Sequence, residues 1–210
     1  MSPIFEFFFD AYKNTSTTDI VLEAIAFFFG IASVVYAKRE NIWVYPTGLV
    51  ATVITVYLLY KAEYFGDMMM NFYYSVMSIY GWWNWSRKRE NKYVVPISRT
   101  NVEEKFVGVA LFFVTMFVTY LVYKTYDYDL QIPNYIDILT SGIFFTAMWY
   151  MATKKLENWT LWIIADVITV PLYAYRGLGM LSLQYLIFTI LAIQGYIQWK
   201  KSLDKSQAIV

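Results

Sequence analysis

The sequence predicts an all-α integral membrane protein with seven transmembrane helices, arranged as two parallel three-helix repeats joined by one linking helix. Of its 210 residues, 59% are hydrophobic and 21% aromatic, whereas only 16% are charged. A soluble domain of this size does not have enough polar surface to cover so apolar a chain. The prediction rests on this composition, on long charge-poor stretches and on an internal repeat.

Seven charge-poor stretches are long enough, or nearly so, to cross a bilayer as helices, which takes about 20 residues. They are Ile20–Ala37, Ile42–Tyr60, Met68–Trp85, Phe106–Tyr123, Ile136–Thr153, Trp159–Tyr175 and Leu178–Trp199. The stretches are apolar on all sides rather than at alternate positions, so we expect helices and no β-barrel strands. The preceding segment has no basic cluster, which argues against a cleaved signal peptide, and forms either a short interfacial helix or a mobile terminus.

An internal repeat relates the first three stretches to the last three. The segment Tyr36–Trp43 before the second stretch resembles the segment Met151–Trp159 before the sixth, and Gly81 lies 114 residues (195 minus 81) before its counterpart Gly195. Because each repeat has an odd number of spans, two repeats directly in tandem would have opposite orientations in the membrane. An additional helix between them makes the two repeats parallel, which gives a 3+1+3 plan known in transporters. We divide the chain into an N-terminal segment (1–18), a first repeat (19–86), a cytoplasmic linker (87–105), a linking helix with an external loop (106–133), a second repeat (134–200) and a cytoplasmic tail (201–210).

The basic residues predict the orientation. Thirteen of the seventeen Lys and Arg fall on one side of the predicted spans, against four on the other. Because Lys and Arg are retained in the cytoplasm, the N-terminus is expected outside and the C-terminus inside, with the acidic loop around Asp127 and Asp129 external.

Residue types missing from the chain exclude several kinds of chemistry. With no Cys and no His, the chain cannot form a disulfide, a thiolate or imidazole metal site, or a Ser-His or Cys-His nucleophile. The formal charge of +1 indicates no nucleic-acid partner. We expect no cofactor and no bound metal. A membrane-embedded enzyme or a seven-helix receptor remains as the alternative class, disfavoured by the short loops and by the repeat.

A single acid, Asp166, lies deep in an apolar stretch, which makes it a candidate for function. Trp159, Trp162 and Asp166 are spaced i, i+3 and i+7, so they share one helix face. An indole face and a carboxylate together suit a flat cationic ligand. Asp166 could instead be hydrogen-bonded to a neighbouring helix, or carry protons. Without a second buried acid or a His as relay partner, we favour uncoupled transport.

Other polar and aromatic residues complete the candidate site. Asn71 and Tyr74 belong to a polar stripe on the third stretch that either lines a pocket or packs helices together. Gln184 and Gln194 lie roughly 80° apart on the last helix, so one of them is expected to face the pocket. The candidate gate residues are Tyr57, Tyr173, Trp82 and Trp85.

These motifs resemble the PnuC family of vitamin transporters. The residues that carry the resemblance are Glu157-Asn158-Trp159-Thr160-Leu161-Trp162, Asp166, Leu181-Ser182-Leu183-Gln184-Tyr185, Gly195 to Trp199, and Ile79-Tyr80-Gly81-Trp82-Trp83-Asn84-Trp85-Ser86-Arg87. The family pattern Trp-x-x-Trp-x-x-x-Asn/Asp is matched by Trp159, Trp162 and Asp166, and the resemblance covers all seven predicted helices.

The resemblance implies uptake of nicotinamide riboside, with thiamine as the alternative cargo of the same family. It also implies a fold akin to SWEET sugar transporters, a homotrimer, facilitated diffusion across the bacterial inner membrane, and trapping of the vitamin by cytoplasmic phosphorylation. Asp166 stands where some family members have Asn. If the cargo is nicotinamide riboside, Asp166 supplies the counter-charge to its pyridinium ring. Trp159 and Trp162 provide a stacking surface or the inner gate. Asn71, together with Gln184 or Gln194, forms hydrogen bonds to the amide and the ribose.

Overall fold

The computed structural model describes residues 8, 15–62, 65–89, 92–93, 95–126 and 129–207. Most of the predicted N-terminal segment, and Asp127 of the acidic loop, lie outside these residues. The described part contains seven long helices: α2 (Thr17–Lys38), α3 (Val44–Lys61), α4 (Phe65–Ser86), α5 (Val102–Tyr126), α6 (Ile132–Ala152), α7 (Glu157–Tyr175) and α8 (Gly179–Gln207). Two strands of two residues each, β1 (Lys88–Arg89) and β2 (Lys92–Tyr93), form a small hairpin between α4 and α5. The predicted all-α class is therefore confirmed.

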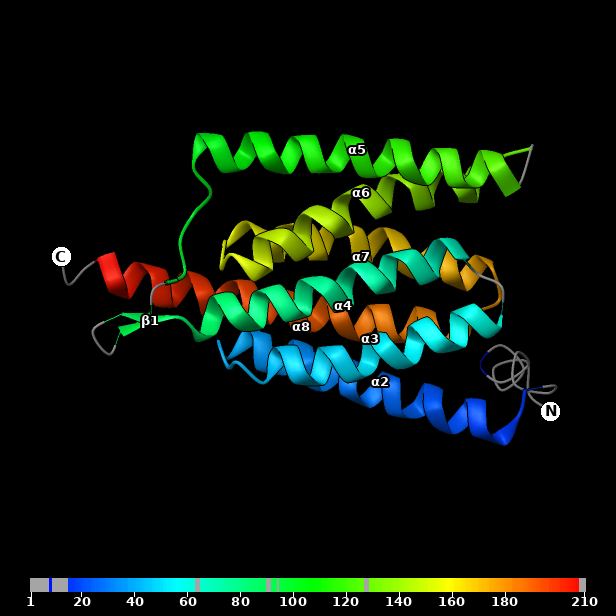
Figure 1. The fold of residues 1–210 in the computed structure, drawn as a ribbon, viewed down its shortest axis with the longest axis horizontal. Helices are drawn as coiled ribbons and strands as arrows, with labels where there is room; N and C mark the ends of the chain where they lie inside the picture. Colours follow the sequence, from blue (N-terminus) through cyan, green and yellow to red (C-terminus); the bar gives the residue numbers. More distant parts are fainter. Residues whose placement is uncertain are drawn as a thin grey trace.

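The helices run roughly side by side, with α5 at one edge of the molecule beside α6 and α2 at the other (Figure 1). Within each set of three, α3 packs against both α2 and α4, and α7 packs against both α6 and α8. The two sets meet where α2 packs on α8 and α4 packs on α6. The β hairpin and the end of α8 lie at one end of the bundle, called the linker end below, and the start of α2 lies at the opposite end (Figure 1).

Four of the seven described helices are long and apolar enough by themselves to cross a membrane: α2, α3, α5 and α8. The helices α4, α6 and α7 are 22, 21 and 19 residues long, but they carry more polar residues. Several of these polar side chains are buried, including Asn84, Asn158 and Asp166. The lower hydropathy of these three helices thus comes from polar groups that the protein itself encloses.

Two boundaries differ from the prediction. Helix α8 continues to Gln207 instead of ending near Trp199, because Leu203 is buried in the core and holds the extra turns of helix against the bundle. Helix α5 begins at Val102, inside the predicted linker. Asn101 caps it: the Asn101 side chain accepts from the Glu104 backbone at 2.8 Å, and the Glu104 side chain accepts from the Asn101 backbone at 2.9 Å.

The internal repeat is visible in the backbone of two loops. Glu40 after α2 and Lys154 after α6 are separated by 114 residues (154 minus 40), and each has a positive φ of 55°. Each nitrogen donates to the carbonyl three residues earlier at 3.0 Å, on Ala37 and Met151 respectively. Both helices therefore end with the same left-handed turn.

The two repeats also share a close packing contact. A β carbon on Gly81 would lie 2.3 Å from the ring of Tyr45, and one on Gly195 would lie 2.7 Å from the ring of Trp159. Tyr45 and Trp159 are again 114 residues apart (159 minus 45). Each glycine allows an aromatic side chain of the preceding helix to approach the helix backbone closely.

The main hydrophobic core lies at the linker end and joins both repeats. It contains residues from α2, α3, α4, α7 and α8, together with Ile97 of the linker and Leu156 just before α7: Ala37, Val44, Tyr45, Trp85, Ile97, Leu156, Trp159, Ala192, Trp199 and Leu203. The larger of the two clusters of buried hydrophobic residues thus joins the two repeats at this end.

Candidate functional site

The predicted face of α7 points into the protein. Trp159 is 1% exposed and Asp166 is 2% exposed, while Trp162 is half-buried. The spacing i, i+3, i+7 therefore places the three residues along one inward face, at successive depths.

Trp159 is enclosed by the core at the linker end. Its ring meets Trp199 edge to face, with centroids 5.5 Å apart, and lies against Gly195. The indole nitrogen of Trp159 has no hydrogen-bond partner within the described part of the chain. In this conformation its surroundings are those of a core residue rather than of an accessible stacking surface.

Trp162 lies in a second aromatic group, which we call the aromatic cluster and define as Tyr74, Phe144, Trp162, Tyr173 and Tyr185. The ring of Trp162 is 5.5 Å from that of Phe144 and 6.2 Å from that of Tyr74, measured between centroids. Four helices, α4, α6, α7 and α8, contribute to the cluster. Phe144 is buried, and the other four members are half-buried.

Tyr185 connects the cluster to the end of the bundle opposite the linker. Its ring stacks on Tyr173 at 5.3 Å with an interplanar angle of 21°, and lies 5.9 Å from Phe144. A continuous series of rings therefore runs from Trp162 to Tyr173. Such flat, electron-rich faces attract cationic ring systems.

Asp166 is the buried acid of this region. Its Oδ1 atom has no hydrogen-bond partner among the described residues. Both Tyr74 and Tyr185 of the aromatic cluster lie within electrostatic range of its carboxylate. A buried carboxylate without compensation is costly, and a cation held between the rings would supply the missing partner.

The three predicted amide residues lie in different surroundings. Asn71 is half-buried and donates to the carbonyl of Asp67 in its own helix at 3.0 Å. Gln184 is half-buried where α8 packs on α2, with Nε2 3.6 Å from where a β carbon on Gly30 would be. Gln194 is exposed, and its Oε1 accepts from Lys38 Nζ at 2.7 Å. Of the two glutamines, only Gln184 therefore lies in a half-buried inter-repeat position.

The candidate gate residues separate into two groups. Tyr57 is 53% exposed and Trp82 is 43% exposed, so both lie on the outer surface of the bundle. Tyr173 belongs to the aromatic cluster. Trp85 is 3% exposed and packs against Tyr45 at 5.1 Å and Trp199 at 5.9 Å. Only Tyr173 and Trp85 therefore lie in the interior between helices.

The sequence analysis missed a polar group at the end opposite the linker. Arg176 Nη2 lies 2.6 Å from Asp137 Oδ2, and the Tyr123 hydroxyl donates to the same oxygen at 2.8 Å. Asp67 lies within electrostatic range of Asp137 and Arg176. The sequence does contain a basic residue, Arg176, on the side with few basic residues, but it does not show which acid pairs with it.

Phe144 and Tyr185 were also missed as site residues. In the sequence each is one of many aromatic residues in an apolar stretch, since the chain has 16 Phe and 20 Tyr. Only the packing of α6 and α8 around Trp162 distinguishes these two residues from the others.

Comparison with known proteins identifies the family. The family model described as nicotinamide mononucleotide transporter matches residues 20–201. The nicotinamide riboside transporter PnuC of Escherichia coli K12 is 23% identical over 205 residues, covering 86% of this chain and 85% of the relative. The riboflavin/roseoflavin transporter RibM of Streptomyces davaonensis is 22% identical over 175 residues, covering 81% and 80%.

A solved structure has the same fold. The crystal structure of the vitamin B3 transporter PnuC superposes with a TM-score of 0.69 at 24% identity, covering 90% of this chain and 84% of the other. The resemblance of the motifs, the match of the family model and the common fold agree. The chain is a multi-pass membrane protein that belongs to the nicotinamide mononucleotide transporter family.

Proposed function

We propose that this protein takes up nicotinamide riboside by facilitated diffusion with alternating access. The observation that carries the proposal is the buried Oδ1 of Asp166, which has no hydrogen-bond partner among the described residues and lies beside the rings of the aromatic cluster. Nicotinamide riboside carries a flat pyridinium cation, which suits this pairing of charge and rings. The relatives named as nicotinamide riboside transporters support the same cargo.

In the proposed complex each side chain has a distinct role. Trp162 and Tyr74 stack on the pyridinium, and Asp166 provides the counter-charge. Asn71 and Gln184 are the candidates for the hydrogen bonds to the amide and the ribose, since both combine a donor and an acceptor. Trp159, enclosed by Trp199 and Gly195, supports the α7 face from the linker end.

The proposed topology is 3+1+3 with all seven helices crossing the inner membrane of a bacterium, the N-terminus outside and the C-terminus in the cytoplasm. The excess of basic residues at the linker end supports this orientation. The identical turns at Glu40 and Lys154 support two parallel repeats formed by α2–α4 and α6–α8, with α5 as the linking helix.

Three further elements complete the proposal. The chain forms a homotrimer, the vitamin is trapped by cytoplasmic phosphorylation, and the protein has no enzymatic activity of its own. The exposed apolar side chains of α5, among them Phe106, Phe113 and Phe117, offer surface for lipid or for a second copy. The proposed transport of the vitamin is not coupled to the movement of protons. A proton flux in fixed ratio to the transported substrate, measured in proteoliposomes, would contradict this.

A binding titration tests the cargo and the site together. The purified protein in detergent is titrated calorimetrically with nicotinamide riboside, thiamine and riboflavin, for the wild type and for Asp166→Ala. We expect saturable binding of nicotinamide riboside alone, at least tenfold weaker in the variant. Binding of thiamine alone would make thiamine the cargo, and binding of riboflavin alone would align the chain with its RibM relative. Absence of binding for all three would reject a vitamin site.

A further inference from the structure

Equivalent residues of the two repeats contact each other at the linker end. Glu40 and Lys154, which are 114 residues apart, lie with Oε2 and Nζ at 3.7 Å. Trp85 and Trp199, also 114 residues apart (199 minus 85), pack with ring centroids 5.9 Å apart. Residues that contact their own counterparts lie on the pseudo-twofold axis that relates two repeats. The axis therefore passes through these two pairs.

Three of the four side chains on the axis are buried, whereas the Glu40 side chain is 34% exposed. Trp199 is 0% exposed and Lys154 is 7% exposed. The Lys154 ammonium group also lies 4.5 Å from the centre of the Trp85 ring, so both pairs belong to one layer. Burial lowers the pKa of Lys154 from its usual value, and the nearby Glu40 carboxylate opposes this effect.

Hydrogen bonds tie the repeats together in the same layer. The indole nitrogen of Trp199 donates to the Ala37 carbonyl at 3.0 Å, from the second repeat to the first. The amide of Asn84 donates to the Ala152 carbonyl at 3.0 Å, from the first repeat to the second.

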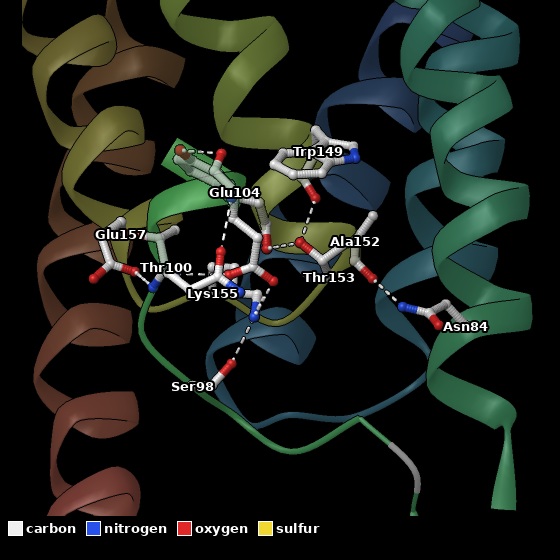
Figure 2. A network of polar contacts seen from close by, with 11 residues as sticks. Asn84, Ser98, Thr100, Glu104, Trp149, Ala152, Thr153, Lys155 and Glu157 are labelled. Carbon is white, nitrogen blue, oxygen red and sulfur yellow. Dashed lines mark hydrogen bonds and ion pairs between the residues drawn. The ribbon is translucent and has the colours of Figure 1, made fainter. Parts of the chain in front are cut away.

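The linker adds hydrogen bonds to this layer. In Figure 2 the segment containing Ser98 passes beside the loop between α6 and α7. Its backbone pairs with that loop: Ser98 donates to the Lys154 carbonyl at 3.1 Å and accepts from Leu156 at 2.9 Å. Lys155 stabilises this pairing of the linker with the loop. Its ammonium group forms an ion pair with Glu104 at 2.6 Å and donates to the Ser98 hydroxyl at 2.9 Å (Figure 2).

The opposite end of the bundle is built differently. There the ion pairs join helices of the same repeat, Lys61 with Asp19 in the first and Arg176 with Asp137 in the second. These pairs stiffen each repeat without fastening one repeat to the other. At the linker end an ion pair thus joins the two repeats, whereas these two ion pairs at the opposite end each join helices within one repeat.

We propose that the Glu40–Lys154 ion pair and the Trp85–Trp199 contact form the inner gate, which must separate for substrate to reach the cytoplasm. The proposal rests on the proposed transport function and adds Glu40, Lys154 and Trp199 to its residues. Rocking of one repeat against the other about the substrate would break contacts on the axis at one end while it closes the other end.

Reversible cross-linking tests the gate, because the chain contains no native cysteine. The double variant Glu40→Cys/Lys154→Cys is joined by a short bis-methanethiosulfonate reagent and reconstituted in proteoliposomes. We expect uptake of labelled nicotinamide riboside to fall at least tenfold after cross-linking and to return when a reductant cleaves the link. Calorimetric binding of nicotinamide riboside to the cross-linked protein should persist.

A matched control is the pair Asp19→Cys/Lys61→Cys, which joins two helices of the same repeat. Cross-linking of this pair should leave uptake within twofold. Full uptake by the cross-linked Glu40/Lys154 variant would overturn the gate, and so would failure of the two cysteines to cross-link. Absence of uptake by the wild type would instead reject the proposed function, and the gate with it.

Charge reversal provides a second test that does not depend on cross-linking. Glu40→Lys places two cations on the axis and should lower uptake about fivefold, whereas Glu40→Lys/Lys154→Glu should recover most of the loss. The same exchange at Asp19 and Lys61 is the control, with little effect on uptake expected. A double exchange no better than Glu40→Lys alone would overturn the role of this ion pair.

Discussion

Gly195 lies so close to Trp159 that a β carbon on the glycine would be 2.7 Å from the indole ring. Gly81 has the same relationship to Tyr45, at 2.3 Å. Both aromatic side chains are 1% exposed, and each packs onto the backbone of the next helix in its repeat. The two glycines are therefore requirements of packing.

Gly81→Ala and Gly195→Ala should each lower the free energy of unfolding by about 1–3 kcal/mol, because the added methyl group must displace a buried ring. The measurement is thermal unfolding in detergent followed by intrinsic fluorescence. Gly30→Ala is the control, since its β carbon would meet its nearest neighbour at an ordinary 3.5 Å. Variants as stable as the wild type would show that the rings do not approach these glycines so closely.

Trp162→Ala should weaken nicotinamide riboside binding roughly tenfold, because it removes the ring that faces Tyr74 and Phe144. Trp162→Phe should retain part of the affinity, since a smaller aromatic face remains. Trp82→Ala serves as the matched control, because Trp82 is 43% exposed on the outside of the bundle. Calorimetric titration gives all three affinities. An equal loss from Trp82→Ala and Trp162→Ala would contradict this assignment of the site.

Gln184→Ala should weaken binding severalfold, whereas Gln194→Ala should not change it. The reason is position: Gln184 is half-buried between α2 and α8, but Gln194 is exposed and hydrogen-bonded to Lys38. The same titration distinguishes the two variants. If Gln194→Ala were the more damaging substitution, the site would lie nearer the linker end than the aromatic cluster.

The Arg176–Asp137 ion pair should stabilise the second repeat. The two side chains are 27% and 18% exposed, so the interaction is partly shielded from solvent. A double-mutant cycle with Arg176→Gln and Asp137→Asn should give a coupling free energy of about 1 kcal/mol in thermal unfolding. Coupling indistinguishable from zero would mean that the pair contributes no net stability.

The helices could be predicted because their evidence is local. A run such as Ile42–Tyr60 is apolar over the length of a bilayer, and α3 begins and ends within two residues of it. The end of α8 could not be predicted, since seven of the eight residues from Lys200 to Gln207 are polar or charged. Helix continues there because Leu203 reaches the core, a contact that depends on other helices.

The candidate site was predictable where a residue stands out from its own helix. Asp166 is an acid in an apolar run, and its inward direction and burial agree with that prediction. Trp159 and Trp162 share the predicted face, but their surroundings differ: Trp159 packs against Trp199, whereas Trp162 packs against Tyr74 and Phe144. Spacing defines the direction of a side chain and carries no information about the neighbouring helices.

The sequence by itself therefore determined the membrane class, the helices and the buried acid, because apolar length and rare residue types are properties of single segments. The tertiary structure decided which glutamine is half-buried between the repeats, which tryptophans face inward, and that Glu40 contacts its own counterpart Lys154. These relationships join residues of different helices that lie far apart in the sequence. They arise from the way α2 packs on α8 and α4 on α6, which no single helix specifies.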